Sequence, residues 1–311
     1  MAQTIATAEL RARFVEAATA KFATNVPDFV ALQKLVADNG GRFRNDHGAI
    51  RTADPAVRDL FVEAAAVLGL QRDLDYAFPA KKLVSFDLQV PGDDSTQFKI
   101  FVSQVDLDAF PPDVAALIRE DCAEQAGAVD HAPFSALIAK AGEAGLEADE
   151  ARVFIDYFVD RLMTRNGPPM KRSTLQAVAE VSGEAASALA LGPDFNHVTI
   201  DVLAAGYPGI DEMTTAMRER GFRLLPKIQG EPGSKLRQTA TMAATMETPV
   251  READGRIGRA QTEKQFVEII ERGLVDSTDG APRIFKNFLA ANAEKIFDAA
   301  STHARAAAES C

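Results

Sequence analysis

This sequence has few cysteines, no long apolar run and no N-terminal targeting pattern. Only Cys122 and Cys311 are present, and they form no Cys-x-x-Cys pair, so we expect no disulfide framework and a reducing compartment. No stretch of 18 apolar residues occurs, which argues against a transmembrane helix. Because the first residues contain neither a basic segment nor an apolar run, we expect no secretory signal and predict a cytoplasmic location.

Basic residues are outnumbered by acidic ones, and the common catalytic motifs are absent. The formal net charge is -11, and a surface of that sign repels phosphate backbones and anionic lipids, so neither nucleic acid nor a membrane is an expected partner. The chain has no Gly-x-Gly-x-x-Gly, P-loop, Gly-x-Ser-x-Gly or His-Glu-x-x-His motif, and residues 230–235 have the wrong spacing for a phosphate cradle. A small molecule is therefore the expected partner, and the oligomeric state stays open.

What is present is an ordinary globular composition. The chain has 311 residues, 47% of them hydrophobic, which is enough for a sizeable core. Helical periodicity lies before, between and after two segments with strand-like alternation. We therefore divide a single catalytic unit into N-terminal helices (1–41), a first β-containing module (42–105), a helical insertion (106–193), a second β-containing module (194–273) and C-terminal helices (274–311).

The two β-containing modules have a similar predicted order of elements. In the first, an extended segment around His47 precedes a helix starting at Asp54-Pro55, and a hairpin follows within 84–102. The second module has the order β-α-β-β-β. Its elements are predicted at 195–203, 211–220, 223–228, 236–242 and 265–272. The predicted fold class is therefore mixed α/β (α+β) with extensive helical additions, and Asn25 is predicted to cap the second of the N-terminal helices.

Two of the four histidines stand out. His131 and His303 lie in polar helical surroundings and are expected at the surface. By contrast, His47 and His197 each lie in a short extended segment that opens a module. In a strand over 195–201, His197 would share one face with Phe195 and Thr199. The alternative for His197 is a core histidine whose ring is hydrogen-bonded to a neighbour.

Glu268 is predicted in the middle of a strand that is apolar on both faces. An unpaired buried carboxylate costs several kcal/mol or takes up a proton, so it needs a cation, a hydrogen-bond network or a metal. A salt bridge to Arg272 or Arg51 is the alternative. Together with His47 and His197, Glu268 would form two imidazoles and one carboxylate, the facial triad of non-haem iron(II) oxygenases, although zinc accepts the same ligands.

Three motifs also carry a resemblance to a known family. They are His-Gly-Ala-Ile-Arg at 47–51, Phe-Asn-His-Val-Thr at 195–199 and Phe-Val-Glu-Ile-Ile-Glu-Arg-Gly at 266–273. In this order they resemble the 2-oxoadipate dioxygenase/decarboxylase family, also called the D-2-hydroxyglutarate synthase family, which is related to the vicinal oxygen chelate enzymes. The third motif is also similar to the last metal-ligand strand of 4-hydroxyphenylpyruvate dioxygenase and hydroxymandelate synthase. The resemblance runs from about residue 40 to 300.

The resemblance implies a role for each matching residue. His47, His197 and Glu268 would bind iron(II) and, through it, the substrate, and Arg51 would bind a substrate carboxylate in catalysis. A weaker match at 285–292 makes Ala291 and Asn292 candidate substrate contacts. Apart from the resemblance, Arg272 falls on the same predicted strand face as Glu268 and would orient that carboxylate, and Asn196 and Thr199 would support the ligands in a similar way. The alternatives are a structural role for Arg51 beside a buried acid and a surface position for Arg272.

The resemblance also implies a fold and a reaction. Paired β-α-β-β-β modules would form a half-barrel of the vicinal oxygen chelate type that cups the metal. The implied reaction is 2-oxoadipate plus O2 giving 2-hydroxyglutarate plus CO2, in lysine breakdown. The chain is shorter than the characterised bacterial members, so the chain length of the 2-oxoacid stays open. Alternatives are a zinc or manganese hydrolase, isomerase or lyase on the same scaffold, and a non-catalytic binding protein.

Overall fold

The computed structural model describes residues 4–92, 96–276 and 280–297. Within them the first module runs β-α-β-β-β. Its elements are β1 (Asn45–Thr52), α3 (Pro55–Val67), β2 (Gln71–Phe78), β3 (Leu83–Gln89) and β4 (Lys99–Val105). The helix begins as predicted, because the Asp54 side chain accepts the N–H of Ala56 and Pro55 occupies the first turn. The sequence analysis does not predict β2, which completes the module.

The second module has the same order. Its elements are β6 (Phe195–Asp201), α9 (Ile210–Glu219), β7 (Leu236–Ala240), β8 (Ala244–Arg251) and β9 (Ile257–Arg272). The predicted strand at 223–228 is wrong: the segment around it forms only isolated bridges, Leu224 to Thr241 and Gln229 to Gln238, and Pro226 has no N–H to donate. The third strand of the module is instead β8, which pairs with the first half of β9.

The two modules form one sheet, joined at its centre. The strand order is β2-β3-β4-β1-β6-β9-β8, β7 also pairs with β9, and the short β5 (Met170–Lys171) lies at the β8 edge. β1 and β6 pair in antiparallel fashion, with His47 opposite Thr199 and Ala49 opposite His197. In this register β1 and β6 are related by a local two-fold axis. The predicted fold class, mixed α/β with two β-α-β-β-β modules, is confirmed.

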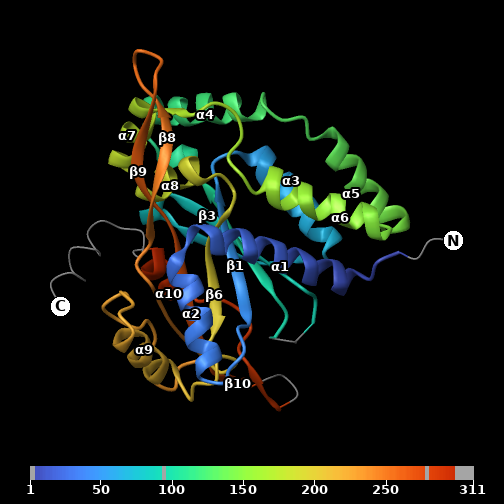
Figure 1. Cartoon of the computed structure of the whole chain (residues 1–311), viewed down its shortest axis with the longest axis vertical. Helices are drawn as coiled ribbons and strands as arrows, with labels where there is room; N and C mark the ends of the chain where they lie inside the picture. The colour runs from blue at the N-terminus through green and yellow to red at the C-terminus, as the bar shows by residue number, and fades with distance from the viewer. Residues whose placement is uncertain (1–3, 93–95, 277–279, 298–311) are drawn as a thin grey trace.

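Helices cover both faces of the sheet, and a core lies on each. On one face, α1 (Thr7–Asn25) and α2 (Pro27–Asp38) cross β1 and β6 (Figure 1), beside α3, α5 (Ala132–Ala144) and α6 (Ala148–Tyr157). On the other face lie α4 (Pro112–Ala126), α7 (Arg172–Val181), α8 (Gly183–Leu191) and α10 (Ala290–Ile296). The side chains of Ile50 and Ala49 point to opposite cores, as successive strand residues do.

The remaining short elements connect these layers. They are the helical turns η1 (Pro79–Lys81), η2 (Leu107–Ala109) and η3 (Phe158–Leu162), and the hairpin of β10 (Leu274–Asp276) and β11 (Pro282–Ile284). No helix in the described ranges is long and apolar enough to cross a membrane.

Two predictions about helix boundaries are wrong. α1 extends to Asn25, and the residue that caps α2 is Val26, with Pro27 in the first turn. Further along the chain, residues 274–276 and 280–289 are not helical, because β10 and β11 pair and the Arg272 side chain binds the carbonyls of Phe285 and Asn287. A helix over 298–311, with His303 and Cys311, lies outside the described residues.

Candidate metal centre

Three adjacent central strands each supply one side chain to a buried cluster. His47 comes from β1, His197 from β6 and Glu268 from β9, and all three are at most 4% exposed. One ligand atom of each lies within 4.8 Å of the others, and no other such group occurs in the described ranges. Glu268 Oε2 lies 3.5 Å from His47 Nε2 and 3.2 Å from His197 Nε2. The strand pairing therefore brings together the three residues that the sequence singles out.

A β-bulge brings a second carboxylate to His47. In the pairing of β1 with β6, Asp46 is an extra residue between the pairs made by Asn45 and His47. Its side chain consequently reaches the His47 ring, and Nδ1 of the ring lies 2.8 Å from Asp46 Oδ2. Arg272 holds the same carboxylate with two hydrogen bonds of 2.8 and 2.7 Å. Arg272 thus binds Asp46 and not, as predicted, Glu268.

His197 also follows a bulged residue, Asn196, but its ring is held differently. It stacks on Phe266 with ring centroids 4.8 Å apart, and its buried Nδ1 has no hydrogen-bond partner among the residues that the structure describes. The buried Oδ1 of Asn196 has no partner either. Because of this bulge Phe195 lies on the opposite face from His197, against Gly48, which corrects the expectation that the two share a face.

Thr199 and Gln238 complete the polar surroundings of the cluster. The Thr199 hydroxyl lies 3.0 Å from His47 Nε2, which places this predicted supporting residue at the site. Gln238, which the sequence analysis does not identify, donates from its side-chain amide to Glu268 Oε1. No sequence pattern marks Gln238 as a site residue, because glutamine is common in strands. Only the pairing of β7 with β9 places its side chain beside Glu268.

The charges in the cluster balance each other. Burial opposes ionisation of Glu268, but His47 and His197 outweigh it and lower the pKa of this carboxyl to about 2. Burial likewise opposes a charge on His47, yet Glu268 and Asp46 raise the pKa of its ring. Burial lowers the pKa of His197. Two buried carboxylates therefore require positive charge, and a proton on His47 supplies part of it.

The residues fit a divalent transition metal in the place of that proton. Both imidazoles present Nε2 toward the Glu268 carboxylate, and Asp46 accepts the Nδ1 proton of His47, which leaves the Nε2 lone pair for a metal. A carboxylate behind a ligand histidine is the usual outer support of such sites. Iron(II) and zinc both accept two imidazoles and one carboxylate.

Arg51 lies further along β1, on the same face as His47. Its side chain is buried, makes no ion pair within the described chain, and has one hydrogen bond there, from Nη1 to the Glu184 carbonyl at 3.5 Å. The guanidinium lies 5.2 Å from the centroid of the Phe297 ring, and its Nε has no hydrogen-bond partner. Burial lowers its pKa, although the nearby Glu184 carboxylate partly offsets this. A buried guanidinium of this kind calls for an anionic ligand.

The other predicted substrate contacts are not brought to the cluster. Ala291 is exposed, and the Asn292 side chain donates to the Leu236 carbonyl. The small pocket at the cluster is instead closed by four other residues near the end of the described chain and by one from β4. They are Phe288, Ala293, Ile296, Phe297 and Phe101.

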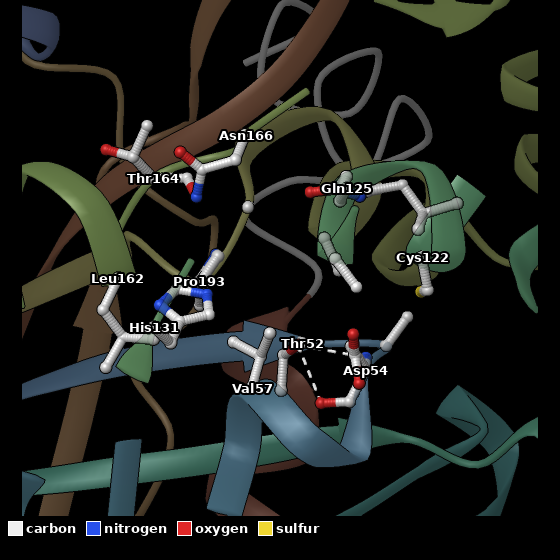
Figure 2. A pocket seen from close by; sticks show the side chains of 15 residues that line it. Thr52, Asp54, Val57, Cys122, Gln125, His131, Leu162, Thr164, Asn166 and Pro193 are labelled. Atoms are coloured by element: carbon white, nitrogen blue, oxygen red, sulfur yellow. Dashed lines mark hydrogen bonds between the residues drawn. The ribbon is translucent and has the colours of Figure 1, made fainter. Parts of the chain in front are cut away.

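A second hollow shares no lining residue with the metal cluster. Figure 2 shows it between Thr52 and Asp54 on one side and Cys122, His131 and Asn166 on others. Its volume is about 40 Å³, room for one or two water molecules. Burial raises the pKa of the Cys122 thiol to about 12, so the thiolate needed for nucleophilic chemistry is not formed. This hollow has the character of a hydrated gap.

Comparison with known proteins gives consistent matches. The family model described as 2-oxoadipate dioxygenase/decarboxylase matches residues 14–309. The 2-oxoadipate dioxygenase/decarboxylase of Mycobacterium tuberculosis H37Rv is 26% identical over a match that covers 89% of this chain and 73% of that protein.

Two solved structures have the same fold at low sequence identity. A glyoxalase superfamily protein from Ralstonia eutropha JMP134 has a TM-score of 0.77 and 19% identity, and the match covers 92% of this chain and 87% of that one. The hydroxyglutarate synthase of Oryza sativa, solved with 2-oxoadipate, has a TM-score of 0.71 and 18% identity, with 98% and 97% covered. The fold is therefore of the glyoxalase, or vicinal oxygen chelate, type, as the sequence resemblance implies.

Proposed function

This chain belongs to the 2-oxoadipate dioxygenase/decarboxylase family, and from that premise we propose that it is an iron(II)-dependent enzyme converting 2-oxoadipate and O2 to 2-hydroxyglutarate and CO2. The observation that carries the proposal is the buried His47–His197–Glu268 cluster, together with the buried guanidinium of Arg51 on the same face of the sheet, which forms no ion pair with the described residues. The Mycobacterium tuberculosis relative carries the same activity in its name.

Each residue of the cluster has a definite task in this proposal. His47, His197 and Glu268 would hold the metal, which when bound supplies activation of O2 and a point of chelation for the 2-oxo group and its carboxylate. Asp46 keeps the His47 ring in the tautomer that offers Nε2. Arg51 would bind a substrate carboxylate with its planar fork. The aromatic rings of Phe101, Phe288 and Phe297 would exclude water.

Oxygen uptake is the measurement that tests the proposal. Protein loaded anaerobically with iron(II) is mixed with 2-oxoadipate, 2-oxoglutarate or an aromatic 2-oxoacid, and the product is identified. We expect uptake with 2-oxoadipate and formation of 2-hydroxyglutarate and CO2. Stoichiometric bound metal without oxygen uptake on any of these acids would instead favour a zinc or manganese hydrolase, isomerase or lyase, since the ligand set also suits those metals.

Single substitutions separate the two parts of the site. His197→Ala should abolish stoichiometric metal binding and uptake, whereas His131→Ala, at the hollow of Figure 2, should change neither. Arg51→Met should leave metal binding intact and raise KM for 2-oxoadipate by about 10²-fold, the loss of a charge-assisted pair. Iron binding and oxygen uptake retained by His197→Ala would refute the metal assignment.

A further inference from the structure

Arg272 is buried, and its guanidinium forms hydrogen bonds with two separate segments of the chain. Nε and Nη2 donate to the two carboxylate oxygens of Asp46 at 2.8 and 2.7 Å. Nη1 donates to the carbonyls of Phe285 and Asn287, both at 2.9 Å. One side chain therefore connects the carboxylate behind His47 with a segment near the end of the described chain.

That segment, residues 285–297, is here called the C-terminal strap, and it covers the metal cluster. Phe288 stands edge-on to the His47 ring, with centroids 4.8 Å apart, and the Arg272 guanidinium lies 5.6 Å from the Phe288 centroid. Ala293, Ile296 and Phe297 line the same pocket. The strap is thus the cover of the site, and Arg272 is bonded to its first residues.

The pocket beneath the strap is too small for a substrate. Its volume is about 10 Å³, roughly that of one water molecule. A six-carbon dicarboxylate needs several times this space, so the strap must move for the substrate to enter. The bonds that Arg272 makes with the strap carbonyls hold it in the closed position.

We propose that Arg272 is a positioning residue that couples closure of the C-terminal strap to the orientation of His47. The inference rests on the metal site of the proposed function. Closing the strap places two carbonyls on Nη1, which fixes the guanidinium, and the fixed guanidinium holds Asp46 against the His47 ring. Opening the strap removes two of the four acceptors and loosens Asp46.

The chemistry of the side chain is what makes this coupling feasible. The planar guanidinium offers five N–H donors in a fixed arrangement, so it can hold a carboxylate along one edge and two carbonyls with the remaining nitrogen. A lysine offers one nitrogen and cannot span both groups. Arg272→Lys should therefore keep the charge beside Asp46 and lose the connection with the strap.

Hydrogen exchange and metal titration test the coupling. In the wild-type protein we expect saturating Co²⁺ to slow amide exchange in peptides that cover 285–292. In Arg272→Lys, exchange there should be fast and independent of Co²⁺, and the Kd for Co²⁺ should rise about 10- to 100-fold, as for other residues that support a ligand. Arg237→Lys is the matched control, because Arg237 is a buried arginine of β7 that pairs with Asp211 on another side of the sheet.

A second variant keeps the test decisive if Arg272→Lys fails to fold. Asp46→Asn lies on β1 and does not bond with the strap, yet the coupling predicts that it too accelerates exchange over 285–292. Unchanged exchange over 285–292 in both variants, with or without Co²⁺, would overturn the proposal. If the wild-type protein binds no metal, the proposed function fails instead, and the effect of Asp46→Asn on strap exchange in metal-free protein still tests the connection.

Discussion

Asp46 and Asn196 are bulged residues of β1 and β6, and each directly precedes a histidine of the metal cluster. The first is a carboxylate bonded to His47 Nδ1 and to Arg272. The second is an amide next to His197, and within the described part of the chain neither its buried Oδ1 nor the His197 Nδ1 has a hydrogen-bond partner. Across the strand pair, the Thr199 hydroxyl lies against His47, whereas Ala49 is opposite His197.

The two modules therefore place their histidines by the same backbone geometry and hold them by different forces. Hydrogen bonds and charge fix His47, and its pKa is raised once burial is outweighed by Glu268 and Asp46. Aromatic stacking on Phe266 holds His197, and burial lowers its pKa. The first module therefore supplies a histidine whose ring is fixed by charged neighbours, and the second supplies a neutral imidazole in an apolar setting.

Among the changes that test this difference between the modules, Asp46→Ala should have the largest effect on the free energy of unfolding. The change leaves the buried Arg272 guanidinium without its carboxylate, which costs about 3–5 kcal/mol in the free energy of unfolding. Asn196→Ala removes an amide oxygen that has no partner and should cost less than about 1 kcal/mol. Urea unfolding of the metal-free proteins measures both values.

A double variant serves as the control for the unpaired charge. Asp46→Ala combined with Arg272→Met removes both members of this ion pair and leaves only Lys99, which lies 3.9 Å from Asp46 in the wild-type protein, without that carboxylate, so part of the lost stability should return. Equal losses for Asp46→Ala and Asn196→Ala would contradict the view that only the first module has a stabilising ion pair at the bulged residue before its histidine.

Gly48→Ala should disturb the contact between the two modules. A Cβ atom at Gly48 would lie 2.4 Å from the Phe195 ring, which is fully buried, so the ring or the strand must shift. Such overpacking costs about 1–3 kcal/mol in the free energy of unfolding. The equivalent position in β6 is Val198, which carries a side chain without this conflict. The change thus tests a steric difference between the modules.

Thermal unfolding of the variants measures this cost. Gly142→Ala is the control, because an added Cβ there meets nothing within 4 Å and the residue lies within α5. In a helix the exchange of glycine for alanine should stabilise by about 0.5–1 kcal/mol. If Gly48→Ala were as harmless as Gly142→Ala, the close packing of Phe195 on β1 would be wrong.

The metal ligands and the supporting residue Thr199 could be predicted from the sequence, but the supporting residues Asp46 and Gln238 could not. His47, His197 and Glu268 lie in short extended segments of strong pattern, and the strand pairing brings them together. Asp46 directly precedes His47 in the sequence, but the two-residue period of a strand predicts that adjacent side chains lie on opposite faces. Only the bulge, which depends on the partner strand, turns Asp46 toward the ring.

The fold shows the same division between local pattern and tertiary context. β2 escapes prediction because it is an edge strand whose side chains are mostly exposed, and its only apolar alternation is the short series Leu74, Tyr76 and Phe78. β8 and the start of β9 form a hairpin that extends beyond the main sheet, beside α4 and α7 in Figure 1, and much of it is exposed. Residues 283–289 have a helical pattern, but Arg272 takes two of their carbonyls.

Phe266→Leu should weaken the second module's histidine alone. The ring of Phe266 lies nearly parallel to that of His197, at 24°, and such contacts contribute about 0.5–1.5 kcal/mol. The Kd for Co²⁺, measured by isothermal titration, should therefore rise about two- to tenfold. Phe288→Leu is the matched control on His47. Since Asp46 also holds that ring, its effect on Kd should be smaller, and the reverse order would contradict the proposed difference.

Thr199→Val should have the smallest effect, and its direction is the informative part. His47 Nε2 and the Thr199 hydroxyl lie 3.0 Å apart and share a hydrogen bond in the metal-free site, with the hydroxyl as acceptor when Nε2 carries a proton and as donor when it does not. A metal on Nε2 must displace that bond, whose net contribution is about 0.5–1 kcal/mol. Valine keeps the shape and removes the competitor, so the Kd for Co²⁺ should fall about two- to fivefold.

Thr239→Val provides the same chemical change without the competition. Thr239 is buried in β7, and its hydroxyl has no hydrogen-bond partner, so the Kd for Co²⁺ should stay as in the wild-type protein. Weaker metal binding by Thr199→Val would show that the hydroxyl supports the metal-bound state, for example by donating to Glu268 once Nε2 is occupied. The polar contacts of His47 would then favour the metal throughout, and the contrast with His197 would be larger than the metal-free geometry indicates.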